Sequence, residues 1–306
     1  MSTPIWLIAG PTACGKSALA LALARETDGE IVNADSMQLY ADLRILTARP
    51  SPAEEAQAPH HLFGIADAAE AWSVGRWLAA ALSALDGISQ RGRTAIVVGG
   101  TGLYFRALAK GLAAIPSVPA MVRAAVQADY DRLGEAAVRD ELRRIDPAAA
   151  QRIAPADRQR LTRAREVFEA TGRALSDWQA DTVPPLPREG WSGVVLTLHR
   201  AELYARIEAR LEEMVASGAR AEVAALMARG LDGRLPAMKA LGVKSFAAEI
   251  AGRLSPAEAL AEAKAETRRY AKRQISWFNH QAGDWPRADA RGGAAAIGRI
   301  LREAAP

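Results

Sequence analysis

The sequence lacks the features that would place the protein in several large classes. Its 306 residues include one cysteine, Cys14, which excludes a disulfide framework and a zinc site built from several cysteines. No apolar run approaches the roughly 18 residues of a membrane-spanning helix, and the first residues carry no basic segment of the kind that begins a secretory signal. We therefore expect a cytoplasmic protein without membrane contact. Because no coiled-coil stripe or internal repeat occurs, we also expect a monomer.

The residues that are present are those of a globular protein. Half of them are hydrophobic and a quarter are charged, and a chain of this length can bury a large core. The formal net charge of +4 is a mild indication of a polyanionic partner. The arginine content of a high-GC genome gives the same charge, so composition alone does not decide this point.

Short apolar runs alternate with helical segments along most of the chain. The sequence predicts buried strands over 5–10, 30–35, 93–100 and 193–200. It predicts helices over 16–27 and 73–92, the second capped by Ser73. Because strands that alternate with helices pair in parallel, we predict an α/β fold with a P-loop NTPase-like parallel sheet and flanking helices.

A middle segment departs from this alternation. Residues 114–188 are Arg-rich, helical in their periodicity, and flanked by the proline-rich stretches "IPSVP" and "VPPLP". We predict that they form an all-helical insertion domain. Residues 1–113 and 189–306 would then form the α/β core with its C-terminal helices.

The stretch "GPTACGKS" matches the phosphate-binding pattern G-x-x-x-x-G-K-[ST], between a predicted strand and a predicted helix. The glycines let backbone N–H groups converge on phosphate oxygens at the positive end of the following helix. Lys16 supplies a mobile cation, and the Ser17 hydroxyl can hold Mg²⁺. The predicted phosphate site comprises Gly10, Pro11, Thr12, Ala13, Cys14, Gly15, Lys16 and Ser17.

The acidic residue nearest to this loop stands in an unusual place. A P-loop enzyme that hydrolyses its nucleotide normally has an acid at the end of a later strand, to help hold Mg²⁺. Here that strand ends in "VVGG", and the acid, Asp35, instead closes the second predicted strand. At the carboxyl edge of the sheet, Asp35 is well placed to meet a second substrate. Alternatively, it caps a following helix, and the local sequence does not separate the two interpretations.

Two further motifs have both a functional and a structural interpretation. In "GGTGLY", the glycines allow a ligand to approach the backbone closely and Thr101 offers a hydroxyl, but an ordinary tight turn has the same sequence. In "PHH", His60 and His61 are of a metal-binding type, but adjacent side chains point in different directions, so we expect a structural role.

Basic residues cluster in two helical segments. One contains Arg160, Arg163 and Arg165, and the other contains Arg268, Arg269, Lys272 and Arg273 at spacings of one helical turn. Such clusters suit contact with a phosphate backbone, but they also occur on solvated helix faces. Both interpretations stay open at this level.

Taken in order, these motifs resemble those of one family, the bacterial tRNA dimethylallyltransferases. The resemblance lies in "GPTACGKSALA", "EIVNADSMQLY", "TARPSPAEE", "PHHL", "VVGGTGLYFRAL", "DPAAAQRI", "DRQRLTRAREVFEATG" and "RRYAKRQISWF". It extends over nearly the whole chain to about Trp285, and the combination is far more specific than the phosphate loop alone.

The resemblance implies a reaction and its partners. Members transfer a dimethylallyl group from dimethylallyl diphosphate to N6 of the tRNA adenine on the 3′ side of the anticodon, assisted by Mg²⁺. The phosphate loop would bind the donor, Asp35 would be the general base, and Lys16 and Thr101 would complete the catalytic set. The helical insertion would grip the tRNA anticodon stem-loop. The implied tRNA-binding residues are Asp35, Ser36, Met37, Gln38, Thr101, Arg123, Gln159, Arg160, Leu161, Thr162 and Arg163.

Several positions depart from the family's pattern. Cys14 replaces a common Ser, Leu46 and Arg49 stand where many members have Gly and Lys, and Arg165 replaces a common Leu. The segment 240–246 also differs from the usual one.

Two other functions fit parts of the sequence. A small-molecule P-loop kinase would use Asp35 to bind the phosphoryl acceptor, but it leaves the basic insertion unexplained. An RNA-binding ATP sensor would bind RNA in a salt-sensitive way and form no product.

Overall fold

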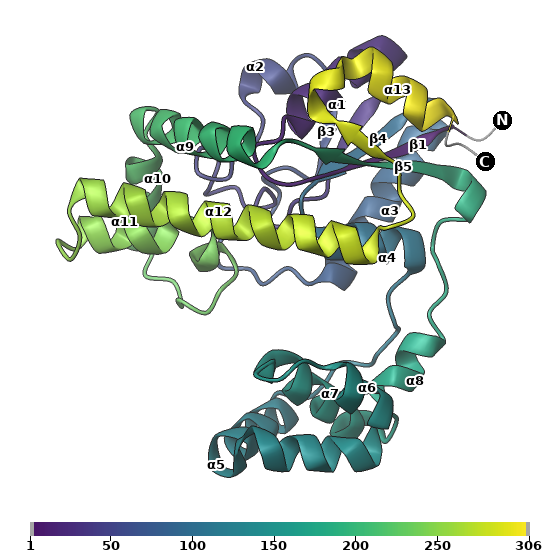
Figure 1. The fold of residues 1–306 in the computed structure, drawn as a ribbon, viewed down its shortest axis with the longest axis vertical. Coiled ribbons are helices and arrows are strands. Elements are labelled where there is room, and N and C mark those ends of the chain that lie inside the picture. Colours follow the sequence, from purple (N-terminus) through teal and green to yellow (C-terminus); the bar gives the residue numbers. More distant parts are fainter. Residues whose placement is uncertain (1–2, 304–306) are drawn as a thin grey trace. The chain divides into compact units, whose positions relative to one another are not determined.

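The chain folds into two compact units, as seen in a computed structural model that describes residues 3–303 (Figure 1). The first unit, called here the α/β unit, runs to Ala109 and resumes at Leu186. The second, called here the helical unit, comprises Lys110–Pro185. The sequence analysis placed the two boundaries at 114 and 188. Within residues 3–303, no helix combines the length and the apolar character needed to cross a membrane.

The α/β unit is built on a six-stranded sheet in the order β3-β2-β4-β1-β5-β6, with every neighbouring pair parallel. The strands are β1 Ile5–Ala9, β2 Glu30–Asn33, β3 His60–His61, β4 Ala95–Gly99, β5 Trp191–Thr197 and β6 Arg287–Asp289. This confirms the predicted α/β class and parallel sheet. The edge strands β3 and β6 were not predicted, because two or three residues are too few to show a hydrophobic period.

Helices cover both faces of this sheet (Figure 1). On one face, α1 Lys16–Thr27 contacts α13 Gly293–Glu303. On the other lie α3 Val74–Gln90 and α4 Gly102–Lys110, joined by a stacked pair of Trp77 and Tyr104 rings. The helix α3 begins where predicted, since the Ser73 hydroxyl accepts a hydrogen bond from the Arg76 N–H at 3.1 Å. The helix α13 ends at Glu303, and residues 304–306 lie outside the described part.

Four helices that follow β5 form a further group in the same unit. They are α9 Arg200–Ala216, α10 Ala219–Ala228, α11 Val243–Ile250 and α12 Pro256–Gln281, and α12 packs on both α9 and α11. The long helix α12 starts with a capping box, in which Ser255 and Glu258 satisfy each other's backbone N–H groups. A short helix, α2 Pro52–Glu55, lies between β2 and β3.

The helical unit contains α5 Ala120–Ile145, α6 Pro147–Arg152, α7 Arg158–Thr171 and α8 Leu175–Ala180. Its small core is formed by Val138, Leu142, Ala149, Ala150, Ile153, Leu161 and Ala164. The helix α5 is interrupted at Gly134, whose φ of 80° is in the left-handed region that favours glycine. A core of this size buries little apolar surface, so polar contacts carry a larger share of the stability of this unit.

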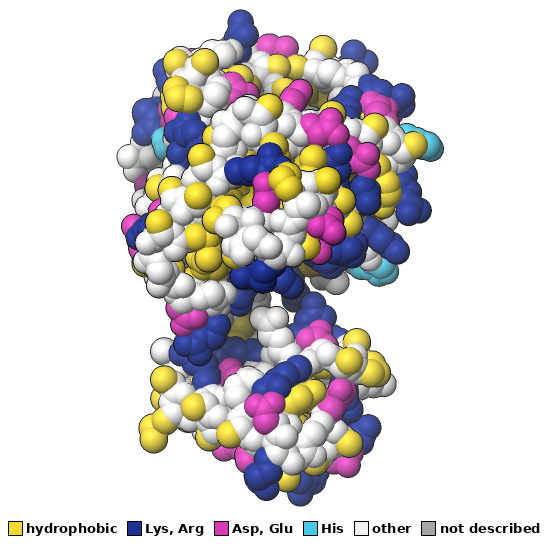
Figure 2. Space-filling view, turned by 90° about the vertical axis from the view of Figure 1, so that its left-hand side faces the viewer, with side chains coloured by type: hydrophobic (Ala, Val, Ile, Leu, Met, Phe, Trp, Pro, Cys, Tyr) yellow, Lys and Arg dark blue, Asp and Glu magenta, His cyan; other side chains and the backbone are white. Residues whose placement is uncertain are grey.

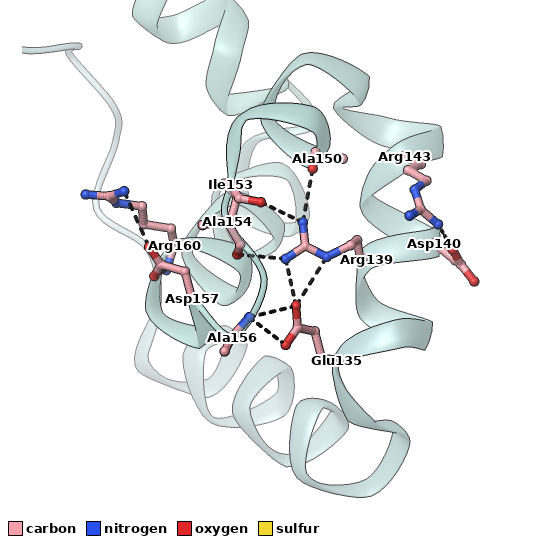
Figure 3. Close-up of polar contacts among 10 residues, drawn as sticks. All are labelled: Glu135, Arg139, Asp140, Arg143, Ala150, Ile153, Ala154, Ala156, Asp157 and Arg160. Atoms are coloured by element: carbon pink, nitrogen blue, oxygen red, sulfur yellow. Dashed lines mark hydrogen bonds and ion pairs between the residues drawn. The ribbon is translucent and has the colours of Figure 1, made fainter. Parts of the chain in front are cut away.

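One such contact is the Arg139 guanidinium, which ties the end of α6 to α5 (Figure 3). It donates to the carbonyls of Ala150 at 3.1 Å and Ile153 at 2.8 Å, and to Glu135 Oε1 at 2.7 Å. The Glu135 carboxylate in turn accepts from the Ala156 N–H at 3.0 Å. These bonds satisfy carbonyls at the C-terminus of α6 and fix the turn that leads into α7.

Candidate active site

Three neighbouring strands bring the predicted chemical groups together at one edge of the sheet. The strands β1, β4 and β2 lie side by side and run in the same direction. Their carboxyl ends lead into the phosphate loop, the "GGTG" corner and the Asp35 turn respectively. Ligands of open α/β sheets bind at this edge.

The phosphate loop has the backbone conformation that its sequence predicts. Gly15 precedes α1 with a φ of 99°, and Ala13 has a φ of 63°, so the chain twice enters the left-handed region. Successive turns of this kind direct N–H groups toward one point, where they bind anions. The side chain of Cys14 is fully buried. The Lys16 ammonium folds over the loop and donates to the Pro11 carbonyl at 2.7 Å.

A magnesium ion would have one hydroxyl of this loop available. Ser17 is exposed in the first turn of α1. Within residues 3–303 no cluster of three or more His, Cys, Asp or Glu side chains is arranged to hold a metal. Mg²⁺ commonly keeps several waters and takes one or two protein ligands plus substrate phosphates. The residues present fit such a site, in which the protein supplies Ser17 and the substrate supplies phosphate oxygens.

Asp35 stabilises a turn and also faces a pocket. Its Oδ1 accepts a hydrogen bond from the Met37 N–H at 2.9 Å, and its own N–H donates to Asn33 Oδ1 at 2.7 Å. No helix begins after Asp35, so the helix-capping interpretation is wrong in its strict form and is replaced by an Asp-stabilised turn. In the described part of the chain Oδ2 accepts no hydrogen bond. One carboxylate oxygen is therefore structural and the other is free for a ligand.

Thr101 connects the glycine corner to this turn. Its Oγ1 accepts from the Ser36 N–H at 2.9 Å and donates to Ser36 Oγ at 3.3 Å, while its own N–H donates to the Ala34 carbonyl at 3.1 Å. Thr101 was predicted to contact substrate, and here its hydroxyl holds the residues beside Asp35.

The glycines of this corner were predicted to make room for a ligand, and protein atoms fill that room instead. A Cβ at Gly99 would lie 2.0 Å from the Ala34 carbonyl oxygen, and one at Gly102 would lie 2.2 Å from the Trp277 ring. These residues have to be glycine because β2 and α12 approach the corner closely. The structural interpretation therefore explains why these two residues are glycine.

A pocket of about 240 Å³ opens beside these groups, within the α/β unit. Its polar lining residues are Thr12, Asp35, Ser36, Thr47, Arg210, Lys239, Glu266, Thr267, Tyr270 and Arg273. Its apolar ones are Ala13, Met37, Leu46, Ala48, Ile207, Leu211, Met214, Ala240 and Leu241. A charged end beside the phosphate loop together with apolar walls suits a ligand that carries both phosphate and hydrocarbon.

Arg210 on α9 is a charged pocket residue that the sequence analysis missed, as it missed Lys239, Glu266 and Tyr270. Burial lowers the pKa of its guanidinium, while the charge of Asp35 acts in the opposite direction. Within residues 3–303, no hydrogen bond or ion pair engages it. A guanidinium that faces a pocket without a carboxylate partner is available to bind an anion. Its signal in the sequence was weak, because α9 carries several arginines and only the fold shows which of them lines the pocket.

A carboxylate fixes a loop that lines the pocket. Glu222 on α10 accepts hydrogen bonds from three consecutive N–H groups, those of Arg44 at 2.6 Å, Ile45 at 2.8 Å and Leu46 at 2.8 Å. Gln38, predicted to contact tRNA, donates through Nε2 to the carbonyls of residues 47 and 48, each at 2.9 Å. The Gln38 amide therefore holds the same loop.

In the helical unit the structure divides the predicted RNA-binding segment 159–163. Gln159 and Arg160 are exposed and Arg163 is partly exposed, whereas Leu161 and Thr162 are buried. Leu161 belongs to the core of the unit, so its side chain cannot be a surface contact. The helical period explains the division, because five consecutive residues cannot share one face of α7.

Arg165 corrects the prediction for the first basic cluster. Its side chain is 10% exposed and forms ion pairs with Asp129 at 2.9 Å, Glu141 at 3.2 Å and Glu169 at 3.7 Å. Three carboxylates around one guanidinium make it a structural residue and remove it from any phosphate-binding face.

The second basic cluster is also divided. Arg268 pairs with Glu208 of α9 at 2.5 Å, Arg273 lines the pocket, and Arg269 and Lys272 are exposed.

Arg123, from the helical unit, is exposed and donates to the Val118 carbonyl at 2.9 Å. On the face drawn in Figure 2, basic side chains of both units are interleaved with acidic ones. Arginine count alone is therefore a poor guide to the RNA-binding surface.

The "PHH" motif has a structural role, as expected, because His61 contacts the buried carboxylate of Glu30 on β2. His61 Nε2 lies 2.6 Å from Glu30 Oε2, and Arg91 makes two contacts of 2.8 and 2.6 Å with the same carboxylate. The Arg91 hydrogen bonds, with His61, lower the pKa of Glu30 to about 2. This network lies at the start of β2, away from the carboxyl edge that holds the pocket.

Comparison with known proteins gives a consistent result. Residues 38–281 match the family described as IPP transferase, and residues 3–62 match the one described as isopentenyl transferase. The chain is 61% identical to the tRNA dimethylallyltransferase of Phenylobacterium zucineum, over 95% of this chain and 94% of that protein. It is 59% identical to that of a Caulobacter strain, over 94% and 93%.

Solved structures agree with the sequence comparison. The full-length tRNA isopentenylpyrophosphate transferase of Bacillus halodurans is 31% identical, with a TM-score of 0.70 over 99% of this chain and 98% of that one. A eukaryotic dimethylallyltransferase described as acting on tRNA is 26% identical, with a TM-score of 0.84 over 97% of this chain and 78% of that one.

Proposed function

This chain belongs to the IPP transferase family and is a tRNA prenyltransferase, and we propose that it transfers a dimethylallyl group from dimethylallyl diphosphate to N6 of the adenine on the 3′ side of the anticodon. Family membership favours this reaction over the small-molecule kinase. One observation carries the proposal. The phosphate loop, the unpaired Arg210 and the Asp35 carboxylate, which has one oxygen without a hydrogen bond, meet at one partly apolar pocket.

The diphosphate of the donor occupies the phosphate loop in this proposal. N–H groups of the loop and the start of α1 surround its oxygens, and the Lys16 ammonium moves from the Pro11 carbonyl to the phosphate. Arg210, across the pocket, contributes a second cation. Fixed positive groups of this kind stabilise the charge that develops on the diphosphate as its bond to the allylic carbon breaks.

The acceptor is the adenine amine, and Asp35 acts on it. The amine nitrogen forms a bond to C1 of the dimethylallyl group while the bond from C1 to the diphosphate oxygen breaks. The proton released by the amine passes to Asp35 Oδ2, while Oδ1 stays bonded to the Met37 N–H. A turn that is already formed orients the base before the substrate arrives. The apolar walls around Met37 and Leu46 hold the hydrocarbon and limit access of water to the allylic carbon.

Magnesium fits the same arrangement. Ser17 would hold the ion together with diphosphate oxygens. When bound, Mg²⁺ neutralises part of the diphosphate charge.

Both units take part in RNA binding in this proposal. A tRNA base has to leave its stack to reach an enclosed pocket, and Ser36 and Met37 line the place where it would enter. The exposed residues Gln159, Arg160 and Arg163 of the helical unit, with Arg123, contact the anticodon stem-loop. We take the active form to be a monomer working in the cytoplasm, where tRNA is found.

The decisive experiment measures the product. The protein is incubated with Mg²⁺, dimethylallyl diphosphate and tRNA that lacks the modification, and the digested nucleosides are weighed by mass spectrometry. We expect adenosine heavier by one dimethylallyl group in place of a hydrogen. If no prenylated adenosine forms and phosphate is transferred from ATP instead, the proposal is wrong.

A further inference from the structure

We propose that Gln274 on α12 is a positioning residue, which fixes the donor-binding loop at a set distance from the general base. This inference rests on the proposed function and adds to it a residue that never touches the substrate. The side chain of Gln274 is buried, with 5% of the residue exposed. A buried amide needs partners for both its ends, and here both partners belong to the active-site edge of the sheet.

The two ends of the Gln274 amide hold two different strand ends. Its Oε1 accepts from the Thr12 N–H of the phosphate loop at 2.8 Å, and its Nε2 donates to the Gly100 carbonyl at 2.9 Å. A Cβ at Gly100 would lie 2.2 Å from Nε2, so the glycine is needed for the amide to reach its place. Glutamine is the side chain that supplies one acceptor and one donor at this length.

The chain of contacts continues from Gly100 to the base. The next residue, Thr101, accepts from the Ser36 N–H at 2.9 Å, and Ser36 follows Asp35 directly. Gln274 thus links the phosphate loop to the "GGTG" corner, and Thr101 links that corner to the turn of the base. Across the sheet this order matches β1, β4 and β2, whose ends hold the donor site, the bridge and the base.

This arrangement also decides which backbone groups can bind the donor. Because the Thr12 N–H is used by Gln274, the N–H groups that face an anion begin at Ala13. The amide is neutral, so it holds the loop without adding charge beside the diphosphate. A displacement of about 1 Å between reacting groups can lower a rate about 10²-fold. We therefore expect the loss of Gln274 to lower kcat and to leave the affinity for the diphosphate nearly intact.

The variants are chosen to separate the two hydrogen bonds from packing. Gln274→Met keeps the length and removes both bonds. Gln274→Glu keeps an acceptor for the Thr12 N–H but places a second oxygen against the Gly100 carbonyl. Phe278→Leu, a buried change one turn further along α12, serves as a control for lost stability, since the Phe278 ring packs against Phe105 and Trp277. Gln281→Met is the same substitution at an exposed position of the same helix.

Steady-state kinetics with dimethylallyl diphosphate and tRNA give the first readout. We expect Gln274→Met to lower kcat by about 10–10²-fold with KM for both substrates changed less than threefold. Phe278→Leu and Gln281→Met should keep kcat within threefold of the unaltered enzyme. Binding of inorganic pyrophosphate with Mg²⁺, measured by calorimetry, should also change less than threefold in Gln274→Met. A loss of pyrophosphate binding parallel to the loss of kcat would overturn the proposal, because Gln274 would then shape the anion site itself.

A second readout tests the coupling to the base. In an Asp35→Asn background, Gln274→Met should have little further effect on the residual rate, because the group that it positions is no longer a base. If Gln274→Met lowers the rate by the same factor in both backgrounds, Gln274 does not act through Asp35 and the proposal is wrong. Failure of the proposed function is distinguishable, since it would appear as no prenylated adenosine from the unaltered enzyme.

Discussion

Arg165 in the helical unit is buried and Arg210 in the α/β unit is partly exposed, and their surroundings differ completely. Arg165 lies among three carboxylates, those of Asp129, Glu141 and Glu169. Arg210 has no ion pair within residues 3–303 and lines a pocket beside Asp35 and the phosphate loop. The first guanidinium is neutralised inside its own unit, and the second retains its capacity to bind an anion.

The α/β unit also contains a neutralised charge, with the signs reversed. There the buried Glu30 carboxylate is paired with Arg91 and His61, and more distantly with Arg93 at 3.5 Å. Each unit therefore contains a closed ionic network that contributes to stability. Arg210 and the free oxygen of Asp35 are charges left without an ionic partner in residues 3–303, and both face the pocket. The comparison indicates that a charged side chain without an ion-pair partner is a better candidate for ligand binding than one that is already paired.

The largest expected effect comes from the open carboxylate. Asp35→Asn keeps an oxygen for the Met37 N–H and removes the base, so turnover should fall by roughly 10²–10⁴-fold with the thermal stability nearly unchanged. Asp35→Ala should lower turnover by the same factor and should also lower the melting temperature, because it removes the hydrogen bond that stabilises the turn. Rates from single-turnover assays and melting temperatures of both variants check this. An Asp35→Asn enzyme with normal turnover would show that Asp35 serves only the turn.

The next effect compares the two arginines directly. Arg210→Ala should lower kcat about 10²-fold or more, the usual cost of one lost group that stabilises developing negative charge, without lowering stability. Arg210→Lys should restore part of the rate.

Arg165→Met should do the opposite. It removes the cation from Glu141 and Glu169 and leaves Asp129 with Arg132 alone, so the free energy of unfolding should fall by about 1.5–3 kcal/mol, while pyrophosphate binding stays normal. Urea denaturation and calorimetry measure the two quantities. The comparison fails if Arg210→Ala unfolds the protein or if Arg165→Met abolishes pyrophosphate binding.

A smaller effect is expected on the stability of the protein at acidic pH. The folded protein holds the pKa of Glu30 at about 2, whereas its ordinary value is 4.5, because Arg91 and His61 bond its ionised form. The stabilisation is complete above pH 4.5 and is lost as the pH falls toward 2, since the unfolded chain takes up the proton first. The free energy of unfolding should fall by about 3 kcal/mol over this interval through Glu30. Glu30→Gln should show a shallower acid slope in urea melts, and an unchanged slope would contradict this account.

The smallest effect is expected on the surface of the helical unit. Arg160 is exposed and pairs with Asp157 at 3.4 Å, a pair worth less than about 1 kcal/mol (Figure 3). Arg160→Ala should weaken tRNA binding a few-fold and reduce the slope of log K against log salt by about 1. Arg143→Ala, which removes a similar exposed pair with Asp140, is the matched control. Equal losses in both variants would mean that total charge, and no particular contact, binds the RNA.

Much of the α/β unit could be predicted because its signals are local. The helix over 16–27 follows from strong helix formers after a phosphate loop, and Ser73 caps the helix α3 as its sequence indicates. The edge strands β3 and β6 could not be predicted, since they are two and three residues long and owe their pairing to the neighbouring strands.

The candidate site was predicted only in part, because its members come from distant segments. Arg210 and Gln274 lie more than 170 residues beyond Asp35 in the chain, and nothing in the local sequence distinguishes them from their neighbours. Arg165, by contrast, looked like its exposed neighbours until the fold placed it among carboxylates.

The sequence by itself determined the phosphate loop, the class of fold and the presence of an acid at the end of the second strand, because each depends on neighbouring residues. Tertiary structure decided what these parts do together. Parallel pairing placed the ends of β1, β4 and β2 side by side, and α9 and α12 then brought Arg210 and Gln274 to that edge. The fold also decided which charged side chains have an ion-pair partner, because the distance between two residues in space cannot be read from their separation along the chain.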